Sequence, residues 1–261
     1  MTDPYLSVHK ENTMRRFDDR VVVVTGGTAG IGLAIAEEFA ELGADVVISG
    51  RNRQRGDDAV ERITTAGGCA AFVQSDVSDA DDIRDLIETT IDDRGQIDVL
   101  VNNAAIEFNR PLVETTLDDY ELVMSTNLRS YYYASVLAIR NMVQRGSGTI
   151  ININSVTRDH PIPGTGLYAM SKGAITLLTK SLAIEHGADG IRVNEICPGT
   201  IRTAIYETTE GAELAEGAVA ATPLGRLGEP SEIAKAAVFL ASEDSSFTTG
   251  STWLIDGGLT I

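Results

Sequence analysis

Short runs of β-branched residues alternate with longer amphipathic segments along most of the chain. The short runs predict strands at 21–24, 45–49, 70–74, 99–101, 149–153, 192–196 and 252–255. The amphipathic segments predict helices at 31–42, 53–66, 79–94, 117–144, 166–187 and 230–241. Near-continuous apolar strands separated by helices are typical of a parallel sheet covered on both faces. The pattern therefore predicts an α/β fold, a doubly wound parallel β-sheet flanked by helices on both faces.

The same pattern bears on domain organisation. It contains no repeat, no low-complexity linker and no break, so we expect one domain at 19–261 behind a flexible N-terminal tail at 1–18. The segment 201–222 is rich in Ala, Glu and Thr and weakly patterned. We expect it to be an insertion that lies over the functional site.

Composition excludes several classes of partner. The formal net charge of −17 argues against nucleic acid, because phosphate binding needs a positive field. No apolar stretch approaches the roughly 20 residues needed to cross a bilayer. The N-terminal segment is polar and lacks the apolar core of a signal peptide. We therefore expect a cytoplasmic protein that does not bind membranes.

The cysteine and histidine content predicts neither a disulfide nor a metal site. Cys69 and Cys197 fall in or beside predicted strands, which favours reduced cysteines in the core. No cluster of His, Cys, Asp and Glu has metal-ligand spacing, so no metal is expected.

A glycine-rich segment lies where the first predicted strand meets the first predicted helix. Residues 25–32 read Thr-Gly-Gly-Thr-Ala-Gly-Ile-Gly, which places Gly26, Gly30 and Gly32 in a Gly-x3-Gly-x-Gly spacing. Glycines at such a turn let the backbone approach a pyrophosphate, and the N–H groups of the helix N-terminus point at it. The same glycines could serve packing alone. We interpret the segment as a dinucleotide-binding loop.

The end of the second predicted strand bears on which dinucleotide is bound. An acidic residue about 20 positions after the glycines commonly binds the ribose 2′-hydroxyl. Gly50 occupies that place here, and Arg51 follows it. A guanidinium suits a 2′-phosphate through paired charge-assisted hydrogen bonds, although an exposed loop arginine needs no ligand. We expect NADP(H), with NAD(H) as the alternative.

A candidate proton-transfer set lies in the second half of the chain. Tyr168 and Lys172 are four residues apart in a predicted helix, so their side chains share one face. A free tyrosine has a pKa near 10, and a nearby ammonium lowers that pKa by favouring the phenolate. Ser155 follows the predicted strand 149–153, at the edge where open α/β sheets bind ligands. A Tyr/Lys pair alone is common on helix surfaces, but with Ser155 and the glycine loop it predicts acid/base catalysis.

On these residues the sequence resembles the short-chain dehydrogenase/reductase family from about residue 20 to residue 261. The resemblance is carried by the Thr-Gly-x3-Gly-x-Gly loop, Asp76, Asn102-Asn-Ala-Ala105, Asn127, Ser155, Tyr168 with Lys172, and Pro198-Gly199. The family usually has glycine at the place of Ala105, which is a small change. The resemblance implies a Rossmann-like fold and an oxidoreductase that uses NAD(P).

The resemblance also assigns roles to individual residues. Asn127 would hold a water in a proton relay with Lys172, and Lys172 would bind the nicotinamide ribose together with Tyr168. Asn102 would brace the central strand beside the cofactor. Further cofactor contacts are expected at Thr28, Ile31, Ser49, Asn52, Asp76 and Val77 (the last two against adenine), and at Pro198, Gly199, Ile201 and Thr203 around the nicotinamide amide.

The substrate pocket is expected to form from residues that follow the predicted strands. Candidates are Ile106, Glu107, Phe108 and Asn109, then Val156, Thr157, Arg158 and His160, and Tyr206 within 204–222. The polar members favour an oxygenated substrate such as a sugar or polyol, but they can equally be rim residues. His160 is more readily a loop residue than a base, since Tyr168 fills that role.

We therefore expect reversible hydride transfer between the nicotinamide and a secondary alcohol or ketone, a small molecule, with Tyr168 as acid/base. One alternative is a 3-oxoacyl-thioester (acyl carrier protein) reductase, for which Arg129 and Arg158 could form a basic spot on the acidic surface. An alternative of another class is a non-catalytic dinucleotide-binding regulator. Relatives in the family are usually tetramers built on the two long helices and the C-terminal strand, so we expect a homotetramer, with a dimer as the alternative.

Overall fold

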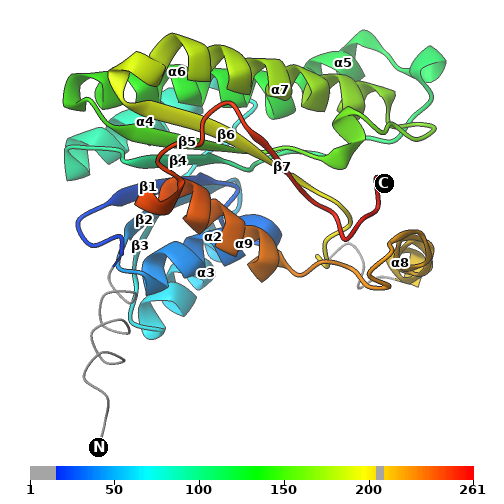
Figure 1. The fold of residues 1–261 in the computed structure, drawn as a ribbon, viewed down its shortest axis with the longest axis horizontal. Helices are drawn as coiled ribbons and strands as arrows, with labels where there is room; N and C mark the ends of the chain where they lie inside the picture. The colour runs from blue at the N-terminus through cyan, green and yellow to red at the C-terminus, as the bar shows by residue number, and fades with distance from the viewer. Residues whose placement is uncertain (1–15, 204–208) are drawn as a thin grey trace, which may run out of the picture.

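The computed structural model describes residues 16–203 and 209–261, in which seven parallel strands form one sheet (Figure 1). The sheet has the strand order β3-β2-β1-β4-β5-β6-β7. The strands are β1 (Val21–Thr25), β2 (Asp45–Gly50), β3 (Cys69–Gln74), β4 (Val99–Asn102), β5 (Gly148–Ile153), β6 (Ile191–Pro198) and β7 (Thr252–Ile255). The predicted doubly wound parallel sheet is confirmed.

Helices cover both faces of this sheet (Figure 1). One face is covered by α2 (Gly30–Glu41), α3 (Arg53–Thr65) and α9 (Pro230–Ala241), and the other by α4 (Ala80–Arg94), α6 (Ser130–Arg145) and α7 (Gly166–His186). Within the described ranges, none of the helices has the length and apolarity to cross a membrane.

The first strand shows how one sequence run serves both cores. Val22 and Val24 belong to the apolar cluster under α2 and α9, whereas Val23 belongs to the cluster under α4, α6 and α7. Successive side chains of a strand point to opposite faces, so a strand buried on both sides needs an uninterrupted apolar run. The strand order reverses between β1 and β4, which is the place where ligands bind in open α/β sheets.

The helix predicted at 117–144 is three segments. α5 (Leu117–Met124) is followed by a π-helical turn at Ser125–Arg129 and then by α6. In the turn, the Ser130 N–H donates to Ser125 O. The segment contains no glycine or proline, so the periodic pattern runs through the widened turn without a signal. Such turns are frequent at functional sites.

One boundary differs from the sequence expectation, and the expected insertion contains a helix. Residues 1–15 of the expected tail lie outside the described residues, but Phe17 is buried, and its ring meets that of Phe39 edge-on at 5.0 Å. The folded part therefore begins before residue 19. Within the expected insertion, α8 (Thr209–Ala221) forms a helix, whereas residues 204–208 lie outside the described residues.

The two cysteines are free and differ in burial. Cys197 is buried in β6, as expected. Cys69 is exposed, so its assignment to the core was wrong. The reason is that Cys69 begins β3, which is the outermost strand on its side of the sheet.

Candidate active site

The glycine loop joins β1 to α2 and has the geometry that glycine alone adopts readily. Gly26 and Gly30 have φ angles of +65° and +55°. A methyl group at Gly32 would lie 2.3 Å from Gly26 O, so a larger residue there would push the helix away from the loop. Asn103 fastens the loop to β4, because its amide donates to Thr25 O at 3.0 Å and to Gly26 O at 3.2 Å.

The N-terminus of α2 fits an anion. The N-cap residue Ala29 offers no side-chain hydrogen bond, and the first turn contains no acidic residue. The first N–H groups of a helix need partners from outside it and attract negative charge. A methyl group at Gly30 would lie 3.4 Å from Thr203 Cγ2, so the segment after β6 approaches the loop from the other side. The expected neighbours Thr28 and Ile31 are partly exposed along the same loop. These residues fit the pyrophosphate of a dinucleotide.

The end of β2 lies beside the glycine loop. A methyl group at Gly50 would come within 3.0 Å of Thr28 Cγ2, so the two segments are in contact. Arg51 is exposed, and within the described ranges no acidic side chain pairs with its guanidinium. Asn52 caps α3 by accepting from Arg55 N, and Ser49 is fully buried with an unpaired Oγ. Among the residues expected to contact the cofactor at the end of β2, Arg51 therefore has the side chain that is best placed to bind a ligand.

The remaining cofactor candidates lie at the carboxyl edge of the sheet. Asp76 accepts from Ser78 N and Ser78 Oγ, and Val77 is buried in the core. Asn102 is buried and donates to Asn152 Oδ1 at 2.9 Å, which braces β4 against β5 as expected. After β6, Gly199 packs so closely on Asp256 that a methyl group would lie 2.8 Å from its Cα. Pro198 ends β6, while Ile201 is buried and bridges to Gly228.

Lys172 is fully buried between α7 and the sheet and is held by groups from three elements. Its Nζ donates to Ile153 O at the end of β5, at 3.0 Å. The same Nζ lies 5.6 Å from the ring centroid of Tyr168 on α7 and 5.3 Å from that of Tyr131 on α6. The Tyr131 hydroxyl donates to the same carbonyl at 2.8 Å. The ammonium is thus enclosed by two aromatic rings and a carbonyl, a cation–π arrangement that partly compensates for its burial.

Burial shifts the ionisation of this group. It lowers the pKa of Lys172 from 10.5 to about 8, while Cys197 and Glu195 act in the opposite direction. It also raises the pKa of Tyr131 well above its ordinary value of 10.0, with a further contribution from Tyr168. Tyr131 therefore stays neutral at physiological pH. Tyr168 is partly exposed in the first turn of α7, where it can reach a ligand.

Ser155 and Asn127 complete the expected catalytic set. Ser155 is partly exposed one residue after Asn154, and its Oγ accepts from Thr157 N at 3.1 Å, which starts a short 3-10 turn. Asn127 lies in the π-helical turn and is fully buried. Its side chain binds both backbone groups of Ile106 and donates to Ser171 Oγ. The amide of Asn127 thus joins the loop after β4 to α7.

The substrate candidates separate into two groups. Glu107 and His160 are exposed on the loops after β4 and β5, where a pocket rim was expected. Val156 is buried, and Arg158 turns inward to pair with the buried Glu195. Tyr206 lies outside the described residues.

Sequence reasoning missed Tyr131 and Asn103. The segment 131–133 consists of tyrosines, and the helical period alone did not reveal which of them faces Lys172. Asn103 was part of the Asn102-Asn-Ala-Ala105 motif, but its bonds to the glycine loop depend on the pairing of β1 with β4, which the motif does not contain.

Comparisons with known proteins agree with this geometry. Residues 26–260 match the family described as Enoyl-(Acyl carrier protein) reductase. The 3-oxoacyl-[acyl-carrier-protein] reductase FabG of Chlamydia pneumoniae is 43% identical over 239 residues, which cover 92% of this chain and 96% of that protein. The NADP-dependent (R)-specific alcohol dehydrogenase of Lentilactobacillus kefiri is 39% identical over 250 residues, with 94% and 98% coverage.

Solved structures give the same result. The crystal structure of a putative gluconate dehydrogenase from Agrobacterium tumefaciens has a TM-score of 0.90 to this chain at 33% sequence identity. The match covers 95% of this chain and 99% of that one.

The buried ammonium leads to a stability prediction for Lys172→Met. Because the pKa of Lys172 is lowered from 10.5 to about 8, the unfolded chain binds more protons between these values, and folding loses stability as the pH falls through that window. We expect the variant to be more stable than wild type at pH 7, by up to about 3 kcal/mol. Ile153 O keeps its hydrogen bond from Tyr131.

Thermal unfolding at pH 7 and pH 10 checks this expectation. The advantage of the variant should be full below pH 8 and should shrink as the pH rises towards 10.5. Lys180→Met, which removes an exposed lysine of the same helix, is the control and should change Tm by less than about 2 °C. A variant with a lower Tm than wild type at pH 7 would show that the carbonyl and ring contacts of Lys172 outweigh its burial.

Proposed function

Because the chain belongs to the short-chain dehydrogenase/reductase family, whose members act on CH–OH and C=O groups, we propose that it interconverts a small secondary alcohol and its ketone with NADP(H). The observation that carries the proposal is the enclosure of Lys172 against Tyr168, at the edge of the sheet where the glycine loop lies. The polar substrate class that the loops favour is a sugar, a polyol or a similar oxygenated carbonyl compound.

The residues divide the chemistry between them. Tyr168 as phenolate accepts the hydroxyl proton in oxidation, and as phenol it donates a proton to the carbonyl oxygen in reduction. The Lys172 ammonium favours the phenolate, and Ser155 donates a hydrogen bond to the substrate oxygen as charge develops there. The nicotinamide ring, when bound, accepts or supplies the hydride. Asn127 holds the turn that would carry a water of the proton relay.

The cofactor is held by the glycine loop, and its phosphate is selected at β2. Gly50 provides no carboxylate for a ribose 2′-hydroxyl, while the uncommitted Arg51 suits a 2′-phosphate. The NADP-dependent alcohol dehydrogenase relative agrees with this choice. NAD(H) is the alternative.

A 3-oxoacyl-[acyl-carrier-protein] reductase is the second candidate, since one such enzyme is 43% identical to this chain. Docking of an acidic carrier would need a basic surface, and the chain has a net charge of −17. The arginines considered for such a spot are engaged, because Arg158 pairs with buried Glu195 and Arg129 donates to Ser78 O. The small-molecule substrate is therefore the preferred proposal.

An apolar stripe on α7 supports the proposal of a homotetramer. Met170, Leu177 and Ile184 are exposed by 49%, 68% and 83% and recur every seven residues. Exposed apolar stripes with this spacing are typical of helices that pair with another helix. Leu254 and Ile261 expose a second apolar region at the C-terminal strand. We propose a tetramer, with a dimer as the alternative, and a cytoplasmic location.

Tyr168→Phe tests the chemistry. Oxidation and reduction are followed at 340 nm with NADPH, NADP⁺, NADH and NAD⁺ over sugars, polyols, simple ketones and acyl thioesters. We expect kcat to fall by about 10² to 10⁴-fold on the substrate that turns over, because the acid/base group is lost. Tyr132→Phe on α6 removes an exposed hydroxyl and should keep the wild-type rate. Wild-type turnover in Tyr168→Phe would exclude the mechanism.

Arg51→Ala tests the choice of cofactor. We expect NADPH to bind about 10- to 100-fold more weakly, since a hydrogen bond to a charged group contributes about 1.5–3 kcal/mol, while NADH affinity stays within about twofold. Fluorescence titration of both cofactors measures this without a substrate. Arg53→Ala is the control, because Arg53 pairs with Asp57 and lies over the Phe72 ring. Equal losses for the two cofactors would remove Arg51 as the discriminator.

Leu177→Glu tests the assembly. A carboxylate in the middle of the apolar stripe would be buried without a partner in a helix-to-helix interface, so we expect the assembly to split into smaller species. Light scattering coupled to size-exclusion chromatography measures the mass. Gln54→Glu adds the same charge on α3, on the other face of the sheet, and should leave the mass unchanged. An unchanged mass for Leu177→Glu would place the interface elsewhere.

A further inference from the structure

A buried carboxylate lies on β6, beneath the helix of the proton-transfer set. Glu195 is on β6, between β5 and β7, and its side chain is 1% exposed. Buried strands in this fold are otherwise apolar, and an ionised group in such a place is costly unless it is paired and hydrogen-bonded. Each polar partner of Glu195 therefore indicates what the carboxylate holds.

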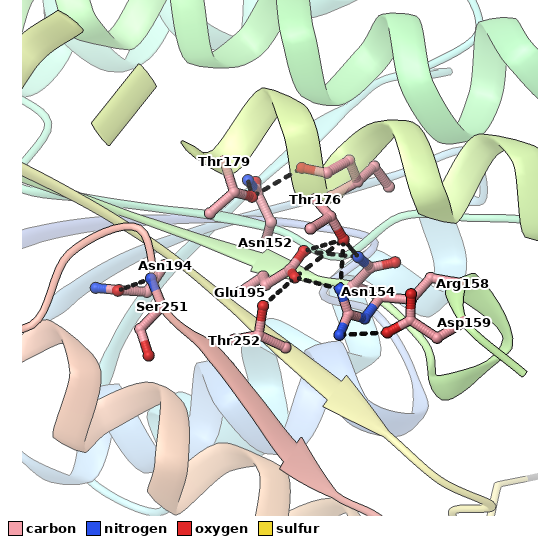
Figure 2. A network of polar contacts seen from close by, with 11 residues as sticks. Asn152, Asn154, Arg158, Asp159, Thr176, Thr179, Asn194, Glu195, Ser251 and Thr252 are labelled. Atoms are coloured by element: carbon pink, nitrogen blue, oxygen red, sulfur yellow. Dashed lines mark hydrogen bonds and ion pairs between the residues drawn. The ribbon is translucent and has the colours of Figure 1, made fainter. Parts of the chain in front are cut away.

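The partners come from β7, α7 and the loop after β5 (Figure 2). Asn154 Nδ2 donates to Glu195 Oε2 at 2.6 Å, and Thr252 Oγ1 of β7 donates to Oε1 at 2.5 Å. Thr176 Oγ1 of α7 lies 3.0 Å from Oε1 and 3.1 Å from Oε2. The Arg158 guanidinium completes the set, with Nη1 3.3 Å from Oε1. The carboxylate thus joins two strands, a helix and the loop after β5.

The Arg158 side chain points inward and binds members of this cluster. Its side chain is 12% exposed, its Nη1 donates to Thr176 Oγ1 at 2.9 Å, and its Nη2 pairs with Asp159 at 2.6 Å. Its Nε is buried without a hydrogen-bond partner among the described residues. The guanidinium of a surface arginine normally stays in water. The Arg158 guanidinium is largely removed from water instead, and the ion pair with Glu195 compensates for this.

Glu195 binds the loop that carries Ser155 at two points, one before Ser155 and one after it. Asn154 precedes Ser155 and Arg158 ends the short turn that Ser155 begins, and both side chains bind the same carboxylate. Thr176 binds that carboxylate from α7, one helical turn beyond Lys172. The loop with Ser155 and the helix with Tyr168 are therefore tied to a common anchor.

The anchor also affects the charge balance around Lys172. The titratable and charged groups that face this region are Tyr168 on α7, Tyr131 on α6, Glu195 and Cys197 on β6, and Arg158 after β5. Glu195 pairs with the largely buried Arg158 and also acts on the buried Lys172. It raises the pKa of Lys172 against the larger effect of burial.

We propose that Glu195 is a positioning residue for the proton-transfer set. Its carboxylate holds residues 154–158 at both ends against α7, so that the Ser155 hydroxyl keeps a fixed place relative to Tyr168. The proposal rests on the proposed function, because it uses the roles given there to Ser155 and Tyr168. No contact between Glu195 and a substrate is required.

The test compares Glu195→Gln, Arg158→Met and the double variant Glu195→Gln/Arg158→Met. Each single variant leaves one charge of the Glu195–Arg158 pair without the other in a largely desolvated place, and we expect Tm to fall by about 10 °C, whereas removal of both charges should restore most of it. In the double variant, an effect on the position of Ser155 can then be measured apart from an effect on folding stability. We expect its kcat to stay about 10- to 100-fold below wild type, while KM for the cofactor and the affinity for NADPH stay within about twofold.

Hydrogen exchange measured by mass spectrometry on the protein without ligands gives a readout independent of turnover. In the double variant, amides of residues 154–160 should exchange about tenfold faster, because Asn154 loses the carboxylate and the side chain at position 158 no longer binds at this site. Amides of residues 26–32 in the glycine loop serve as the internal reference and should be unchanged. Asp159→Asn removes the exposed carboxylate from the same arginine and should match wild type in exchange, Tm and kcat.

The outcomes separate this proposal from the proposed function. Unchanged exchange at 154–160 in the double variant, or a kcat that recovers together with Tm, would overturn the positioning role of Glu195. Retained activity in Tyr168→Phe would instead overturn the proposed function. Faster local exchange with restored Tm and a lowered kcat would support Glu195 as a positioning residue, even if Glu195→Gln alone fails to fold.

Discussion

The burial of the Lys172 ammonium is the constraint on which the rest of the site depends. A cation enclosed in the core must find its partners within the protein, and here they come from different elements: a β5 carbonyl, the ring of Tyr131 and the ring of Tyr168. Each partner can serve only if its own element is fixed. The requirement to accommodate one charge therefore sets the relative positions of β5, α6 and α7.

The sheet could be predicted from the sequence because its strands are buried on both faces and read as apolar runs between turns. The run at 21–24 supplies side chains to both cores, so strand period and burial agree. The glycine loop and the Tyr168/Lys172 pair were also accessible, since each is a local spacing that its chemistry requires. The features that the sequence predicted well thus depend on residues that are close together in the chain.

Features that depend on contacts distant in the sequence could not be predicted. The π-helical turn at Asn127 is coupled to the loop at Ile106, and Tyr131 differs from its tyrosine neighbours only by the direction it faces. Arg158 was expected at the substrate, but Glu195 lies 37 positions further along the chain. A glutamate within a strand predicted to be buried was the available signal, and only the structure shows that its partners converge from β7, α7 and the loop after β5.

The helix α7 has two opposite faces with different tasks. Its buried face carries Lys172 and Thr176, while Met170, Leu177 and Ile184 project from its exposed face. At 1.5 Å per residue, its 21 residues form a rod about 31 Å long. Because one continuous helix carries both faces, a contact that displaces the outer stripe also displaces Lys172 and Thr176. If subunits associate through this helix, as proposed above, dilution that separates them removes a contact from the helix that carries Lys172, and the rate per subunit then depends on protein concentration.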